Sequence, residues 1–218
     1  MAAELAALPV DLIVTWGTPA ALAAKQASTT IPIVMGAIGD PVSVGIVSNL
    51  ARPNGNITGF AAQNVDLEGK RLDLLKDLLP HLSRVGMLTN TTNPLLEVSL
   101  QKLRPAAEQL RVMLDLFDIR SSDEIEGALL RLNQTRPDGV LVAPDLVLLT
   151  HRSEIAAALA KSKLLGTSPS HAATTLGEAV AGPDRGDHGA GDDRSDAGDA
   201  HQAVASGVPF GKLLDLAR

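Results

Sequence analysis

At three places in this chain, an apolar, strand-like run ends in a short loop that closes with a helix-capping residue followed by proline. These pairs are Thr18-Pro19, Asp40-Pro41 and Asn93-Pro94. The cap accepts a hydrogen bond from a free backbone N–H, and proline suits the first helical position because it has no N–H to leave unpaired. The other free N–H groups and the helix dipole favour negative charge. Because such helix ends gather at the carboxyl edge of an open parallel sheet, the pattern predicts a small-molecule binding protein.

Strand-like and helix-like segments alternate along most of the sequence. The short, continuous apolar runs are typical of parallel strands that are buried on two faces. The alternation predicts an α/β fold with right-handed parallel crossovers. We expect strands at 11–15, 31–35, 57–60, 84–88, 112–117 and 138–143. We expect helices at 19–27, 41–51, 67–79, 94–110, 123–133 and 153–163.

The composition excludes several classes of function. The net charge is −6 and no stretch concentrates lysine and arginine, so a nucleic-acid partner is not expected. Cysteine is absent and the five histidines are scattered without HxxxH or HExxH spacing, so no metal site is predicted. There is no GxSxG or GxxxxGK[ST] motif, and the loop at 36–41 lacks the third glycine of a dinucleotide fingerprint. We therefore expect neither an enzyme nor a cofactor.

The first residues have no basic segment followed by a long apolar one, so they do not resemble a secretory signal. No run approaches the roughly 20 apolar residues of a membrane span. The sequence as given therefore predicts a protein that does not span a membrane and that stays in the cytoplasm if expressed in this form.

Four polar residues at the ends of predicted strands are candidate ligand contacts. Asp40 either caps a helix, which is the commoner role, or binds a ligand ammonium as a carboxylate in the crevice. Asn90 and Asn93 either cap their loop or offer amide groups to a ligand. Asp145 follows a strand in Ala143-Pro144-Asp145 and has the same two interpretations.

Several successive motifs together resemble the substrate-binding proteins of ABC uptake systems, in the family linked to tryptophan and tyrosine transport. The resemblance covers roughly residues 1–165. It rests on the segments 11–25, which includes TWGTPAA, 31–42, which includes GAIGDP, and 50–60, which is LARPNGNITGF, and it continues at 69–76, 83–85, 144–145 and 149–152.

The resemblance implies a type I periplasmic binding protein, in which two Rossmann-like lobes close on a ligand and then dock on a membrane permease. It implies a location in the periplasm or a lipid anchor outside the inner membrane. The ligand is expected to be an amino acid or a similar small zwitterion, with its carboxylate at the helix end of Thr18 and its ammonium at Asp40 or Asp145. The implied ligand-binding residues are Gly17, Thr18, Pro19, Asp40, Pro41, Thr58, Gly59, Asn90, Asn93 and Asp145.

The chain departs from the family pattern at both ends. It begins after the family's first strand and helix, and nothing after Gly166 matches the returning strand and closing helix. We expect a partial first lobe at 1–60, a second lobe at 61–166 that lacks mainly its last strand, and an irregular tail at 167–218. A non-functional fragment is the alternative to a working binding protein. The tail is rich in glycine and aspartate, and we interpret it as read out of frame, with a native acidic linker as the alternative.

A different class of function is the alternative to solute binding. A flavodoxin-like or receiver-like α/β module would act by protein contact or as an enzyme. A receiver needs clustered acidic residues after its first strand and a lysine after a late strand, and this chain does not supply that set.

Overall fold

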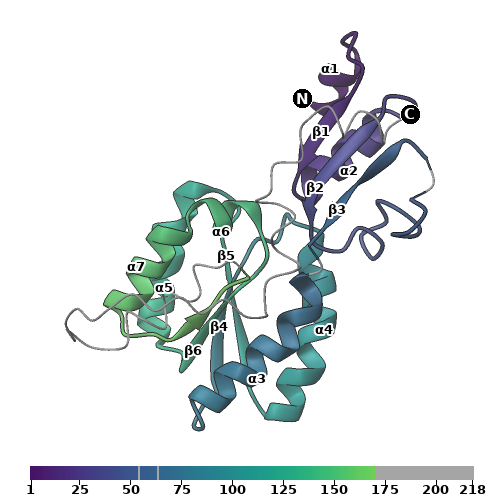
Figure 1. Cartoon of the computed structure of the whole chain (residues 1–218). Coiled ribbons are helices and arrows are strands. Elements are labelled where there is room, and N and C mark those ends of the chain that lie inside the picture. The colour runs from purple at the N-terminus through teal and green to yellow at the C-terminus, as the bar shows by residue number, and fades with distance from the viewer. Residues whose placement is uncertain (54, 63, 170–218) are drawn as a thin grey trace, which may run out of the picture. The chain divides into compact units, whose positions relative to one another are not determined.

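The strands form two separate parallel sheets (Figure 1). The structure is a computed structural model, and it describes residues 1–53, 55–62 and 64–169. The first sheet has the order β1-β2-β3 and consists of β1 (Ile13–Trp16), β2 (Ile33–Ile38) and β3 (Ile57–Ala61). The second has the order β5-β4-β6-β7 and consists of β4 (Arg84–Thr89), β5 (Met113–Asp118), β6 (Gly139–Val142) and β7 (Gly166–Thr167). The predicted α/β class with parallel sheets is confirmed.

Helices connect most successive strands, except β2 and β3, which are joined by turns. The helices are α1 (Ala2–Ala6), α2 (Thr18–Ala27), α3 (Glu68–Leu78), α4 (Leu95–Leu110), α5 (Ile125–Thr135), α6 (Leu146–Thr150) and α7 (Arg152–Lys161), with 3-10 turns η1 (Asn64–Leu67) and η2 (Ser122–Glu124). Helices α3 and α4 lie on one face of the second sheet, and α5 and α7 lie on the other (Figure 1). No helix in the described part of the chain is long and apolar enough to cross a membrane.

The second sheet is covered on both faces, which explains its uniformly apolar strands. Val85, Met87, Leu88, Val140 and Leu141 are all fully buried. Residues that point to opposite faces of a strand can all be buried only where both faces are packed. The helices therefore enclose a continuous core around β4 and β6.

The first sheet is covered differently. Helix α2 packs on one face through Ala21 and Ala24, and β1 alternates between buried and exposed residues. Ile13 is buried, whereas Val14 is 63% and Trp16 is 53% exposed. The prediction of two buried faces is therefore wrong for this strand, because Val14 and Trp16 on its second face are exposed in the described part of the chain.

The predicted helix at 41–51 is wrong. After β2 the chain forms turns, in which Ile46 N and Val47 N both donate to Pro41 O at 2.8 and 3.1 Å. Gly45 has a φ of 74°, which ends any helical continuation. The segment PVSVGIVS is also rich in β-branched and small residues, which have low helix propensity.

The end of the described chain adds one strand that the sequence pattern did not indicate. Gly166 and Thr167 pair with Val140 and Leu141 as β7, at the edge of the second sheet. The rest of the predicted tail lies outside the described residues from position 170 onward. The division into lobes at 1–60 and 61–166 stays a prediction.

Candidate functional site

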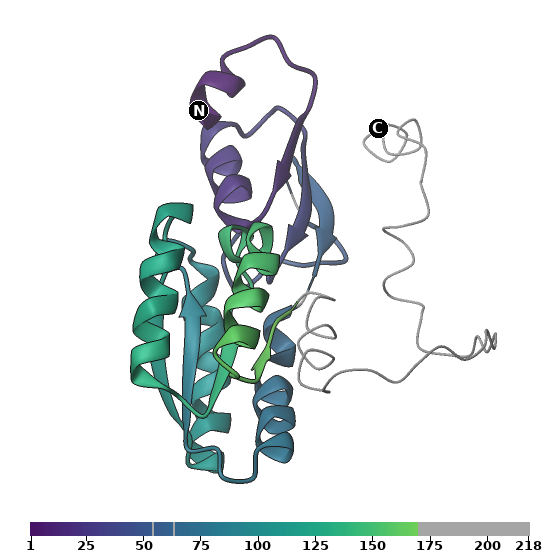
Figure 2. The same ribbon diagram turned by 90° about the vertical axis from the view of Figure 1, so that its left-hand side faces the viewer.

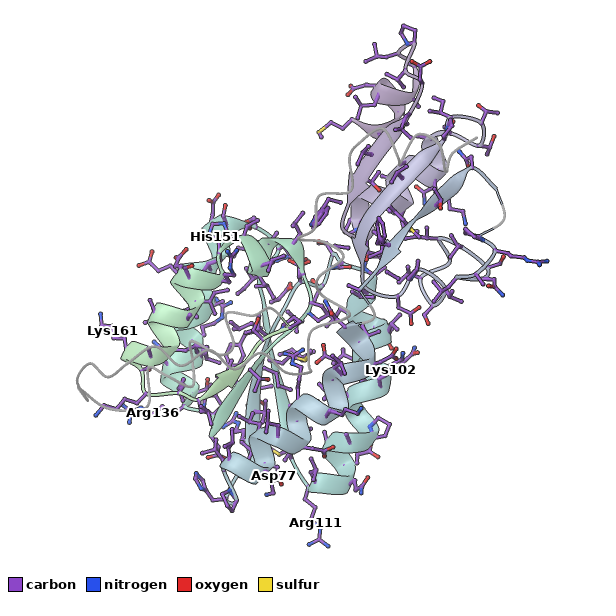
Figure 3. All side chains as sticks on the ribbon, viewed as in Figure 1. Asp77, Lys102, Arg111, Arg136, His151 and Lys161 are labelled. Atoms are coloured by element: carbon purple, nitrogen blue, oxygen red, sulfur yellow. The ribbon has the colours of Figure 1, made fainter. Side chains whose placement is uncertain are left out.

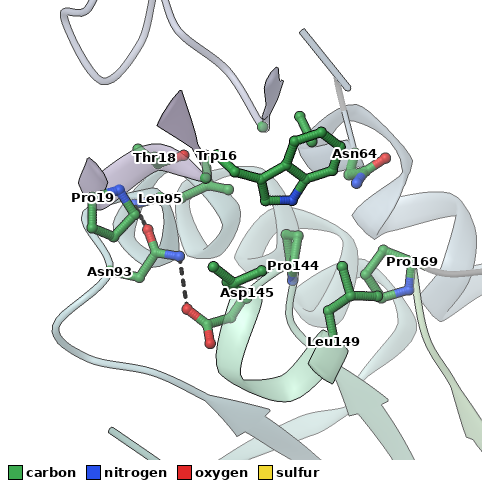
Figure 4. A pocket seen from close by; sticks show the side chains of 14 residues that line it. Trp16, Thr18, Pro19, Asn64, Asn93, Leu95, Pro144, Asp145, Leu149 and Pro169 are labelled. Atoms are coloured by element: carbon green, nitrogen blue, oxygen red, sulfur yellow. Dashed lines mark hydrogen bonds between the residues drawn. The ribbon is translucent and has the colours of Figure 1, made fainter. Parts of the chain in front are cut away.

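A pocket of about 190 Å³ opens at the carboxyl ends of strands from both sheets (Figure 4). One wall comes from the end of β1, the start of α2 and the end of β2. The other comes from the loops after β4, β6 and β7 and from the first turn of α6. The lining residues are Trp16, Gly17, Thr18, Pro19, Ala37, Gly39, Asn64, Asn93, Leu95, Pro144, Asp145, Leu146, Leu149 and Pro169.

The first wall centres on the N-terminus of α2. Gly17 is the N-cap and has a φ of 82°, and its N–H donates to Gly36 O at 3.2 Å. Thr18 was expected to be the cap, but it is the first helical residue, because glycine adopts the required left-handed backbone at little cost. Thr18 is buried and Pro19 occupies the first turn. The N–H groups of this turn have no partner within the helix, so they favour an anionic group in the pocket.

Asp145 is the N-cap of α6 on the opposite wall. Its Oδ1 accepts hydrogen bonds from Val147 N at 2.8 Å and Leu148 N at 3.3 Å. Its Oδ2 accepts from Asn90 Nδ2 at 3.2 Å and Asn93 Nδ2 at 2.9 Å. Among the described residues that line the pocket, Asp145 carries the only carboxylate. Four donors therefore hold this carboxylate in one orientation at the edge of the pocket.

The two asparagines cap their loop, which is one of the two roles that the sequence left open, while a contact with ligand stays a prediction. Asn93 Oδ1 accepts from Leu95 N at 3.0 Å at the start of α4, and Asn90 Oδ1 accepts from Thr92 N at 3.0 Å. Their amide nitrogens point the other way, to Asp145 (Figure 4 shows the bond from Asn93). Asn93 lines the pocket, whereas Asn90 lies behind it beside a smaller cavity. The amides therefore connect the loop after β4 to the loop after β6.

Asp40 is held by other groups. Ser43 N donates to its Oδ1 at 3.0 Å and Ser43 Oγ to its Oδ2 at 2.7 Å, while Lys102 Nζ lies 3.6 Å from Oδ2. Burial opposes ionisation of this carboxyl, but the Ser43 hydrogen bonds and the Lys102 charge hold its pKa below the usual value. In the described structure Asp40 does not line the pocket.

Lys102 on α4 pairs with Asp40 in the loop after β2 and with Asp66 on η1. We call these three residues the latch. The ammonium of Lys102 donates to Asp66 Oδ1, and this bond is the largest cause that raises the pKa of Lys102. The latch fastens the loop after β2 to α4, close to the point where Gly39 packs against Leu95.

Replacing Lys102 by methionine is expected to lower the free energy of unfolding by no more than about 1 kcal/mol, because the pairs are partly exposed. The loss should shrink as salt is raised, since salt screens exposed charges. Denaturation in urea at low and high salt measures it, with Lys70→Met on α3 as the control. A loss that is independent of salt would contradict an ionic latch.

The remaining predicted residues lie outside the pocket in the described structure. Pro41 is buried in the turn after Asp40, and Thr58 and Gly59 are exposed on β3. Sequence reasoning missed the apolar part of the wall, chiefly Trp16, Leu146 and Leu149. The one available signal was Trp16, the single tryptophan of the chain, which comes directly before the glycine that caps α2.

The family model of ABC transporter substrate binding proteins matches residues 1–164. This chain belongs to that family. The match covers both parallel sheets except the short edge strand β7, which begins two residues after the match ends. The resemblance that the motifs indicated is therefore confirmed.

Particular members and structures are similar to this family member over part of their length. A tyrosine-binding protein of Clostridioides difficile strain R20291 is 33% identical over 120 residues, which are 55% of this chain and 34% of that protein. The ABC domain of Streptococcus pneumoniae in complex with L-Trp has a TM-score of 0.70 at 24% identity, over 80% of this chain and 60% of that one. A conserved domain protein of Vibrio cholerae has a TM-score of 0.71 at 22% identity, over 81% and 58%. The chain thus spans about a third to three fifths of the length of these relatives.

Proposed function

We propose that this substrate-binding protein holds an amino acid with an aromatic side chain in the pocket between its two sheets and delivers it to a membrane permease. The observation that carries the proposal is the pairing of opposite polarity across one pocket. A helix N-terminus lies on one wall and a fixed carboxylate on the other, with apolar side chains between them. A zwitterion with an apolar side chain matches this arrangement.

Each part of such a ligand has a partner. The ligand carboxylate would accept hydrogen bonds from the first turn of α2 and from the Thr18 hydroxyl, where the dipole favours negative charge. The ligand ammonium would donate to Asp145, which we prefer to Asp40 because Asp145 lines the pocket and its four donors are uncharged, whereas Asp40 already pairs with the ammonium of Lys102. Gly17, Pro19 and Asn93 would shape the same walls.

The aromatic side chain is supported by the other pocket residues. The half-exposed ring of Trp16 faces Leu149 and Pro144 across the pocket (Figure 4), and Leu146 lines the same pocket. Such a wall suits a flat apolar group. The relative at 33% identity is named for binding tyrosine. Function outside the inner membrane, contact with a permease and the absence of catalysis belong to the same proposal, because they follow from the family.

Calorimetry with L-tyrosine, tyramine and 3-(4-hydroxyphenyl)propionate tests the proposal. We expect L-tyrosine to bind, and the two analogues, which lack the carboxylate or the ammonium, to bind at least about tenfold more weakly, since each charged contact is worth more than about 1.4 kcal/mol. Equal binding of all three compounds would contradict the two polar walls.

Trp16→Ala should weaken tyrosine binding about tenfold through the lost ring contact. The matched control is Val14→Ala, which removes an exposed side chain from the same face of the same strand but lies outside the pocket. If both variants bind tyrosine like the unaltered chain, the ligand lies elsewhere.

A further inference from the structure

Helices α5 and α7 form a second concave surface, away from the pocket described above. They run side by side on the outer face of the second sheet, on the side turned to the viewer in Figure 2. Between them lies a groove of about 950 Å³, the α5–α7 groove. Its middle is apolar, with half-buried Leu129 and Ala158 and with Leu130, which is 59% exposed. A single exposed leucine would need no explanation, but Leu129, Leu130 and Ala158 together give the groove a contiguous apolar floor that another chain can cover.

The two ends of the α5–α7 groove carry opposite charges. Glu126 and Glu154 lie in the first turns of α5 and α7. Arg136 directly follows α5 and Lys161 ends α7, with Lys163 two residues further on. Figure 3 shows Arg136 and Lys161 at the same end of these helices and His151, which contacts Glu154, at the other. The acidic and basic ends are separated by roughly 15 Å, the length of an 11-residue helix.

We propose that two copies of this chain associate through the α5–α7 groove about a two-fold axis perpendicular to the helices. Such an axis brings the acidic end of each groove against the basic end of the other and places Leu130 of both copies near the centre. Every contact then occurs twice, as in other interfaces with two-fold symmetry. This proposal is independent of the ligand.

Charge complementarity favours a second copy as the occupant. A helix that lies antiparallel to α5 and α7 must be acidic at its N-terminus and basic at its C-terminus to match both ends. Helix α7 has this distribution, and α5 has it together with Arg136, the residue that directly follows it. The charged pairs lie at the rim, so they mainly set orientation and make association sensitive to salt, while the apolar centre supplies the attraction.

Two oppositely altered variants test the proposal by sedimentation velocity. The basic variant combines Glu126→Lys with Glu154→Lys, and the acidic variant combines Arg136→Glu with Lys161→Glu. We expect the unaltered chain to form dimers reversibly with concentration, and each variant alone to dissociate about tenfold more readily or worse, because like charges meet at both ends. A one-to-one mixture of the two variants should recover a dimer. Asp77→Lys on α3 is the control and should leave association unchanged.

The remaining outcomes are equally decisive. An unaltered chain that is monomeric at all concentrations overturns the proposal, as does a dimer that is indifferent to both charge reversals. Failure of the mixture to recover a dimer also overturns it, because the acidic and basic ends of the two copies then do not meet. Circular dichroism checks that the variants are folded. If they are not, Leu130→Ser is the substitute, and it must weaken the dimer for the proposal to stand.

Discussion

Gly59→Ala is expected to lower the free energy of unfolding by about 3 kcal/mol or more, as a large steric clash in a sheet does. Gly59 lies on β3 with a φ of 143°, and it pairs in register with Met35 on β2. A Cβ at this position would come within 1.9 Å of Met35 O. Because that oxygen belongs to the backbone of the central strand, the clash is relieved only by separating β2 from β3. Unfolding in urea, followed by circular dichroism, measures the loss.

Gly69→Ala on α3 is the matched control for this substitution. A Cβ there meets only Ala106 Cβ at 3.6 Å, which is an ordinary contact, and the backbone is helical. Alanine should therefore stabilise the helix by about 0.5–1 kcal/mol. If Gly59→Ala fails to lower the free energy of unfolding, as is expected of Gly69→Ala, the pairing of β2 and β3 in this register is wrong.

Glu68→Ala is expected to cost about 3 kcal/mol, because it leaves a buried guanidinium without its counter-charge. Glu68 is fully buried, and its Oε1 accepts from Arg71 Nη1 at 3.1 Å. Arg71 Nη2 also donates to Val142 O at 2.6 Å and Thr167 O at 3.1 Å, at the ends of β6 and β7. The pair therefore fastens α3 to the edge of the second sheet. Glu68→Gln keeps an acceptor for Arg71 and should cost clearly less in the same urea titration.

The pH dependence of stability tests the same pair. Burial raises the pKa of Glu68 to about 6, although Arg71 opposes the rise. Since the folded pKa lies above the ordinary value of 4.5, the folded state binds the proton more tightly. The contribution of Glu68 is therefore greatest below pH 4.5 and falls by about 2 kcal/mol as the pH rises to 6 and above. The Glu68→Gln side chain cannot ionise, so the stability of this variant should rise relative to that of the unaltered chain as the pH increases from 4.5 to above 6. A constant difference between the two would contradict a buried, titrating Glu68.

The fold was predictable where burial alone decides the local structure. The runs around Val85 and Val140 are apolar without interruption because both faces of β4 and β6 are packed. Such runs are too short for a buried helix, so they predict strands. The segment 41–51 was not predictable from its cap. Asp40 does accept a hydrogen bond from Ser43 N, as a helix cap would, but Gly45 with its positive φ ends this first turn and no helix follows.

The site was predictable only where neighbouring strands end. Asn90, Asn93 and Asp145 follow β4 and β6, which are adjacent in the sheet, so their meeting follows from topology. Asp40 has a partner on α4, which is distant in sequence, and its pairing depends on packing. Trp16 reaches the pocket because it is the last, outward-facing residue of β1, and the open face of the first sheet could not be foreseen.

The most direct test of the ligand site is a titration of the ¹⁵N-labelled chain with L-tyrosine, followed by NMR. We predict saturable shifts that are largest at the backbone N–H groups of Gly17, Thr18 and Ala20 and at the indole N–H of Trp16, because these groups surround the start of α2. Pro19 gives no signal since it has no N–H. Shifts at Asn93 Nδ2 should accompany them, because this amide is bonded to Asp145. Absence of saturable shifts, or shifts that spare Trp16 and Thr18 while others move, would contradict the account.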